Sequence, residues 1–176
     1  MSLRNQSYWE ISNLDINGAN IPGVSHGINI TVHDYGQLDH IYIKDNYLHD
    51  IAGSLQTKIS GGIFLTISGT SVKSWFNHVR IENNTIRHTD RTGITLDAFR
   101  SWEDKRLGTY EPGTWVPCTD VVIRGNFLDD IGGDGIVLTD FLLEAGANAV
   151  LIFVTDLPKT ECARLCYSIY ETGLNT

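Results

Sequence analysis

Positive charge is scarce in this sequence. It contains 13 lysine and arginine residues against 21 aspartate and glutamate residues, which gives a formal net charge of −8. Nucleic-acid binding requires a dense basic face that neutralises phosphates, so we expect no nucleic-acid partner. A polyanionic ligand would be repelled unless a cation or a local basic patch offset the repulsion.

Cysteines and long apolar runs are also scarce. Three cysteines do not make a disulfide framework, and no zinc-ligand spacing surrounds them, so we expect no metal or other cofactor. No apolar run approaches the ~18 residues of a membrane helix, so we expect no membrane partner. The first residues lack the apolar stretch of a signal peptide, which leaves the localisation open. We expect the chain to be a fragment of a longer one.

A pattern of apolar residues and glycine recurs four times along the chain. Each copy has an apolar anchor, a second apolar residue five positions later, and then a glycine followed by apolar-x-apolar. The anchors are Ile11, Ile43, Ile81 and Ile123, and the glycines are Gly27, Gly62, Gly93 and Gly135. Apolar residues at two-residue spacing lead into each anchor, which indicates strands. Each copy is therefore predicted to hold three short strands joined by turns.

Stacked coils explain this pattern physically. Equivalent residues of stacked coils lie about 4.8 Å apart, so the inward isoleucine, leucine and valine side chains form continuous apolar columns. Asn46, Asn84 and Asn126 each stand three residues after an anchor, where an asparagine tolerates a tight turn and bonds to the next coil. Leu14 interrupts this series in the first copy.

The repeats resemble the right-handed parallel β-helix family, which includes pectate lyases and polygalacturonases. The resemblance lies in the runs 81–86 and 130–138 and covers residues 9–140. The predicted fold class is therefore all-β, a right-handed parallel β-helix of about four coils over residues 1–140. The right-handedness, a carbohydrate ligand and a secreted or periplasmic location are what the resemblance implies.

The repeat fades after Leu138, and residues 141–176 are predicted to form a different C-terminal segment. Residues 149–154 are apolar enough for one more strand, and residues 156–173 have the capping and spacing pattern of a helix. Such a helix would cover the open end of the solenoid. The alternative is that the native fold continues here with further coils.

Extra chain between the anchors predicts loops at one corner of the solenoid. The predicted loops, 31–39, 66–77 and 97–119, grow along the stack and follow the glycine-containing strand. Loops stacked at one corner would form a wall beside a flat face, and therefore a cleft. The alternative is that they cover sheet edges or an oligomer contact, and the sequence leaves the oligomeric state open.

The longest predicted loop carries candidate substrate-binding residues. Aromatic rings stack on sugars, whereas arginine and lysine bind carboxylates or sulfates. The candidates are Arg100, Trp102, Lys105, Arg106 and Trp115. The alternative is that the tryptophans pack onto the solenoid.

The third and fourth coils carry the candidate catalytic residues. They are Asp97, Asp130, Asp134 and His88. Glycoside hydrolysis needs two carboxyl groups, about 5 Å apart for retention or about 6.5–9.5 Å apart for inversion, and neighbouring coils supply such separations. Strand alternation points Asp97 outward. Each aspartate has a competing role in stabilising a turn.

The function predicted from these observations is that of a polysaccharide-active protein, with a glycan along the solenoid face near the third and fourth coils. A glycoside hydrolase is the favoured reading. One alternative is a polysaccharide lyase, which would use a lysine, arginine or histidine base and neutralise charge with calcium or arginine. The other is a non-catalytic module that binds glycans or has a structural role.

Overall fold

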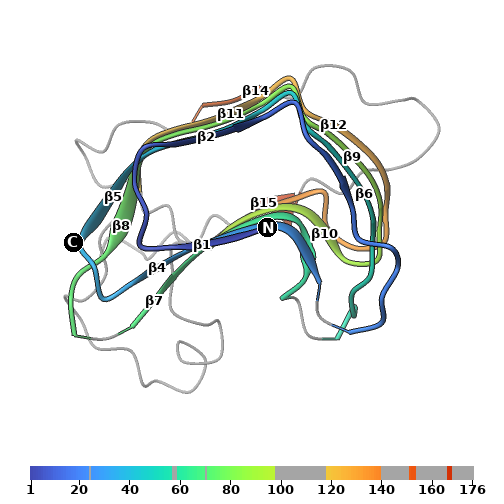
Figure 1. Cartoon of the computed structure of the whole chain (residues 1–176), viewed down its shortest axis with the longest axis horizontal. Coiled ribbons are helices and arrows are strands. Elements are labelled where there is room, and N and C mark those ends of the chain that lie inside the picture. The colour runs from blue at the N-terminus through green and yellow to red at the C-terminus, as the bar shows by residue number, and fades with distance from the viewer. Residues whose placement is uncertain are drawn as a thin grey trace, which may run out of the picture.

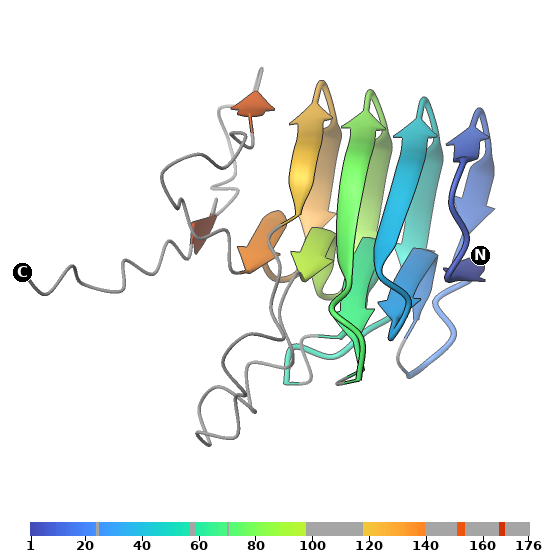
Figure 2. The same cartoon turned by 90° about the vertical axis from the view of Figure 1, so that its left-hand side faces the viewer.

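The computed structural model describes residues 1–23, 25–56, 59–69, 71–97, 118–139, 151–153 and 166–167. These residues contain strands and no helix, and successive strands wind around a common axis (Figure 1). Seen from the side, the strands of neighbouring coils lie next to one another (Figure 2). The prediction of an all-β parallel β-helix is confirmed.

Three parallel sheets make up the solenoid, and each takes one strand from every complete coil. Sheet A has the order β1-β4-β7-β10-β13-β15, with bounds Ser2–Arg4, His26–His33, Gly61–Ser68, Thr92–Asp97, Ile136–Thr139 and Cys166–Tyr167. Sheet B has the order β14-β11-β8-β5-β2, with bounds Leu151–Phe153, Thr119–Arg124, Trp75–Glu82, Gln37–Lys44 and Trp9–Ser12. Sheet C has the order β12-β9-β6-β3, with bounds Phe127–Ile131, Thr85–Thr89, Tyr47–Ile51 and Asp15–Asn17. The four complete coils are β2-β3-β4, β5-β6-β7, β8-β9-β10 and β11-β12-β13.

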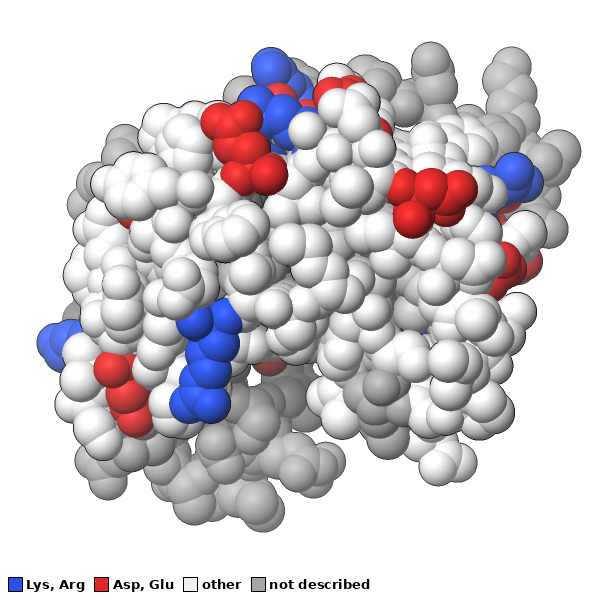
Figure 3. All heavy atoms as spheres, in the orientation of Figure 1, with Lys and Arg blue, Asp and Glu red and all other residues white. Residues whose placement is uncertain are grey.

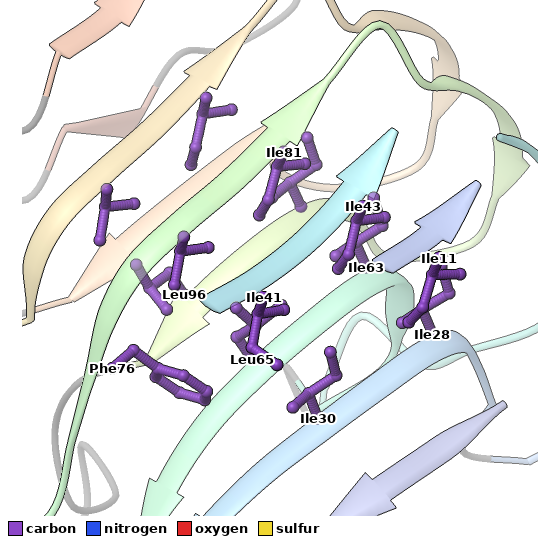
Figure 4. Packing of buried hydrophobic residues seen from close by; sticks show 14 of the residues in the cluster. Ile11, Ile28, Ile30, Ile41, Ile43, Ile63, Leu65, Phe76, Ile81 and Leu96 are labelled. Atoms are coloured by element: carbon purple, nitrogen blue, oxygen red, sulfur yellow. The ribbon is translucent and has the colours of Figure 1, made fainter. Parts of the chain in front are cut away.

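The register of the strands aligns the sequence repeats. The anchors pair in series, Ile11 with Ile43, Ile43 with Ile81 and Ile81 with Ile123. The strands after the glycines pair likewise, from Ile28 through Ile63 and Ile94 to Ile136. These side chains meet inside the coil as columns (Figure 4) and are at most 7% exposed. Each fully buried isoleucine contributes about 2 kcal/mol through removal of apolar surface from water.

The asparagine ladder is also present. Asn84 Nδ2 donates to Oδ1 of Asn126 at 2.9 Å, and Asn46 Nδ2 donates to Oδ1 of Asn84 at 3.0 Å. Each of the three side chains also donates to a backbone carbonyl of the preceding coil, at 2.8–2.9 Å. The ladder therefore satisfies buried polar groups at the turn between sheets B and C.

The predicted loops after sheet A are shorter than expected in the first two cases. Strands cover both ends of the predicted loops 31–39 and 66–77, so the connections are residues 34–36 and 69–74. Outward polar side chains pair across the coils here, as in the 3.3 Å hydroxyl contact between Thr31 and Thr66. Much of the extra chain in the first two coils lies instead between sheets C and A, at residues 18–25 and 52–60.

The C-terminal predictions have mixed outcomes. The strand expected within 149–154 is confirmed as β14, which extends sheet B from β11. The helix expected over 156–173 is wrong at its two described residues, which form β15 and pair with β13. An open strand edge offers unpaired backbone groups that another strand can satisfy. The rest of that range lies outside the described residues, and the division at residue 140 stays a prediction.

Candidate functional site

Asp97 lies on sheet A, whereas Asp134 lies just before β13, near the opposite end of the sheet A strands. Asp97 ends β10 and pairs in register with Thr66 and Thr139. Its neighbour Leu96 is fully buried, so alternation turns Asp97 outward, as expected. Asp134 lies in the row of Thr92, at the start of β10. The two rows are about 16 Å apart, too far for both carboxyl groups to flank one glycosidic bond.

Asp134 is the counter-ion of a buried arginine. Its Oδ2 lies 2.9 Å from NH2 of Arg91, whose side chain is 6% exposed. Among the described residues, Nε of Arg91 has no hydrogen-bond partner. A buried guanidinium is costly without a paired carboxylate, so Asp134 has a structural role whatever its chemical role.

The other two predicted residues meet at the corner that follows sheet C. Asp50, His88 and Asp130 stand in successive coils near the ends of β6, β9 and β12, each with positive φ, at 55°, 50° and 52°. The strand ladder resumes in register after them, at Ile51, Thr89 and Ile131. The left-handed backbone therefore makes one outward column, which we call the corner column.

His88 lies between two carboxylates in the corner column. Its Nδ1 is 3.4 Å from Oδ1 of Asp50, and its Nε2 is 3.7 Å from Oδ2 of Asp130. The side chain of Asp130 is 70% exposed and that of His88 is 47% exposed, so both are accessible. Asp50 was not predicted from the sequence as a site residue. Like His88 and Asp130, however, Asp50 stands two residues after the second apolar residue of its copy.

A second histidine holds Asp50 from its other side. Nδ1 of His49 lies 2.7 Å from Oδ2 of Asp50, and Nε2 lies 2.9 Å from Oδ1 of Asp15. The hydrogen bond to Asp50 is the main cause that raises the pKa of His49, with Asp15 adding to it and desolvation opposing it. Asp50 is therefore positioned by two imidazoles.

The corner column approaches the geometry of a two-carboxyl site. Asp50 and Asp130 are two coils apart, about 9.6 Å, which is close to the upper end of the spacing for inversion. The imidazole of His88 occupies the space between them, so a substrate oxygen could enter only after this side chain changed rotamer. Among the described residues, no group of three or more histidine, cysteine, aspartate or glutamate side chains could hold a metal ion.

The remaining site predictions stay untested. Arg100, Trp102, Lys105, Arg106 and Trp115 lie outside the described residues, as does most of the loop that would wall the cleft. On the face seen in Figure 3, acidic and basic side chains of the described residues are interspersed rather than separated. The described part of the chain contains no helix that is long and apolar enough to cross a membrane.

Comparison with known proteins gives one family and one distant relative. A family model described as a right-handed β-helix region matches residues 1–148. Lacto-N-biosidase from Bifidobacterium longum subsp. longum is 27% identical over 122 residues, which cover 57% of this chain. The match spans only 8% of the length of that relative. No solved structure matches the chain.

Proposed function

Because this chain belongs to the right-handed β-helix family, we propose that it acts on a polysaccharide or oligosaccharide bound outside the solenoid, near the third and fourth coils. The proposed reaction is glycoside hydrolysis. The name of the relative, lacto-N-biosidase, supports this reaction class, since it denotes a glycoside hydrolase. The short match to that relative supports neither its substrate nor its mechanism for this chain.

The corner column is the observation that carries the proposal. Asp130, on the fourth coil, is its most exposed carboxyl group, at 70%, and lies beside His88 of the third coil. In the proposed site Asp130 exchanges a proton with the glycosidic oxygen or with water, and Asp50 supplies the second carboxylate. His88 swings out of the gap when the sugar enters. Asp97 remains a separate candidate on the outward face of sheet A.

The test is a screen of plant, algal and host glycans, with reducing ends measured as product. Once a substrate is found, Asp130→Asn should lower kcat by about 10² to 10⁴, the usual contribution of a general acid or base. Asp129→Asn is the matched control, because this neighbouring carboxylate pairs with Arg87 at 2.6 Å. If Asp130→Asn retains the full rate, the corner column is not the site. An inactive Asp97→Asn would then move it to sheet A.

A polysaccharide lyase is the second candidate, because an exposed imidazole such as that of His88 can serve as the base. Its products would be unsaturated sugars, detected by their ultraviolet absorbance, and chelation of calcium would test for a charge-neutralising cation. Glycan binding without any product would leave the non-catalytic module as the function and would refute both enzymatic proposals.

A further inference from the structure

The outer face of sheet B carries a row of polar side chains that belongs neither to the corner column nor to sheet A. Tyr8, His40, His78 and Asp120 stand at equivalent positions in four successive coils, each with positive φ, at 64°, 58°, 56° and 50°. The strands pair in register on both sides of His40, His78 and Asp120, so no strand has an extra residue here. The left-handed backbone is repeated in each coil and turns the side chains of the row outward. Tyr42 lies in the adjacent row, with its ring centroid 4.0 Å from that of His40.

Three of these residues are connected in a chain of polar contacts. The hydroxyl of Tyr42 is hydrogen-bonded to Nε2 of His78. On the other side of the imidazole, Nδ1 lies 3.2 Å from Oδ2 of Asp120. A carboxylate at this distance favours the proton on Nδ1, which leaves the lone pair of Nε2 to accept the proton of the phenol.

Two cations hold and polarise this chain. Arg80 donates to Oδ1 of Asp120 at 2.8 Å and to its backbone oxygen at 2.7 Å, so the carboxylate is fixed against His78. The ammonium of Lys44 lies 4.1 Å from the ring centroid of Tyr42. Its other charged contact, with Glu82, is 3.9 Å long and therefore longer than a hydrogen bond.

We propose that Tyr42, His78 and Asp120 form a second reactive site, in which Tyr42 is a nucleophile toward carboxylic esters with a small acyl group. The arrangement has the connectivity of an activated hydroxyl, in which a base takes the proton and an acid group orients the base. In the proposed site, the ammonium of Lys44 turns from the face of the Tyr42 ring toward the oxyanion of the tetrahedral intermediate and stabilises it. The side chains of His78 and Asp120 are both 40% exposed, so an ester can reach the site from solvent.

The reaction balances without any added cofactor. The phenol oxygen of Tyr42 attacks the carbonyl carbon while its proton passes to Nε2 of His78. The carbon–oxygen bond to the leaving group breaks, and His78 returns the proton to the departing oxygen. Water then gives a proton to Nε2 and attacks the carbonyl carbon of the acyl-tyrosine. The bond between this carbon and the phenol oxygen breaks, Nε2 returns the proton to that oxygen, and the carboxylic acid and Tyr42 are released.

A second tyrosine–histidine pair provides an internal comparison. Tyr47 and His49 also stack, with ring centroids 4.4 Å apart. Both nitrogens of His49, however, are engaged by Asp15 and Asp50, so neither can accept the proton of Tyr47. The two pairs share their residue types and differ in the proton path, which makes Tyr47→Phe the matched control for Tyr42→Phe.

The experiment measures release of p-nitrophenolate from p-nitrophenyl acetate and maps the acetyl group by peptide mass spectrometry. We expect the acetyl group on Tyr42 and its loss on treatment with hydroxylamine, which cleaves aryl esters but not acetyl-lysine. Tyr42→Phe and His78→Gln should lower the rate by about a hundredfold, the lower range for loss of a proton-transfer partner. Tyr47→Phe should change the rate less than twofold.

Two results would overturn the inference: a Tyr42→Phe variant with more than half of the wild-type rate, or acetyl groups divided equally between Tyr42 and Tyr47. Far-UV circular dichroism of each variant verifies the fold. The site is independent of the proposed glycoside hydrolysis. An inactive glycan screen would not affect the acetyl-tyrosine measurement, and an unmodified Tyr42 would not affect the glycan screen.

Discussion

Replacing Asn84 by alanine should be among the most damaging single changes in the solenoid. Asn84 is fully buried, at 0% exposure. Its Nδ2 donates to the carbonyl of Ile43 and to Asn126 Oδ1, both at 2.9 Å. Its Oδ1 accepts from the backbone N–H and from Nδ2 of Asn46, at 3.1 and 3.0 Å. Asn84→Ala removes all four hydrogen bonds and leaves the Ile43 carbonyl and the Asn46 N–H unpaired in the core.

The size of this effect follows from the two orphaned backbone groups. An unsatisfied buried group costs about 1–3 kcal/mol, so we expect Asn84→Ala to lower the free energy of unfolding by about 3–5 kcal/mol. That is a large share of the roughly 5–15 kcal/mol typical of a domain. Urea denaturation followed by far-UV circular dichroism measures it.

Asn126→Ala is the matched control for Asn84→Ala. Asn126 is only partly buried, so water can replace some of its bonds, and we expect about half of the loss. The ladder argument is refuted if Asn84→Ala costs less than about 1 kcal/mol, or no more than Asn126→Ala.

Two further predictions concern charged groups. Asp134→Asn should cost about 3–5 kcal/mol in urea denaturation, because it leaves the buried guanidinium of Arg91 unpaired, and adding Arg91→Met should restore most of the loss. The pKa of His49 is raised above 6.5, so the folded chain binds the proton more tightly than the unfolded chain. The resulting stabilisation is complete below the unfolded pKa and is lost as pH rises through the folded pKa. The Tm advantage of wild type over His49→Gln should therefore shrink as pH rises above 6.5, the ordinary pKa of histidine.

Each of these has a control within the chain. Asp129→Asn breaks a more exposed ion pair with Arg87 and should cost no more than about 1 kcal/mol. If it costs as much as Asp134→Asn, burial is not the cause. Burial lowers the pKa of His26, so His26→Gln should show the opposite trend, with the wild-type advantage shrinking in acid. Equal pH profiles for wild type and His49→Gln would contradict the assigned pKa direction.

The inward half of this fold was predictable from the sequence. Ile43 and Ile81 must face the interior of every coil, so their chemistry repeats, and the structure pairs them in the expected register. Asn84 was predictable for the same reason, since a buried turn restricts which residue can fill it. The helix expected around Cys166 was wrong. The spacing of apolar residues in a short segment contains no information about a strand edge elsewhere in the chain, such as that of β13, with which this segment pairs.

The outward half was much harder to predict. His40 and His78 lie within β5 and β8, and no motif in the sequence singles them out as functional. Their contact with Tyr42 depends on a left-handed backbone residue with positive φ that recurs in each coil, and outward positions carry no repeated residue type that would reveal it. Asp97 and Asp134 were expected to lie close together because they are on neighbouring coils. Their separation along the strand direction, however, is larger than the spacing between the two coils.

The shared register of the strands makes each coil a structural unit that could be added or removed as a whole. Each coil presents apolar residues at the same inward positions to its neighbouring coils, although the anchors are spaced unevenly along the chain, as at Ile43, Ile81 and Ile123. Duplicating or deleting one whole coil would therefore recreate the same interface on both sides. Surface connections can differ from copy to copy because they do not enter that interface. The coil is the exchangeable part of the molecule, and the length of the outer faces can change in steps of one coil while the core stays the same.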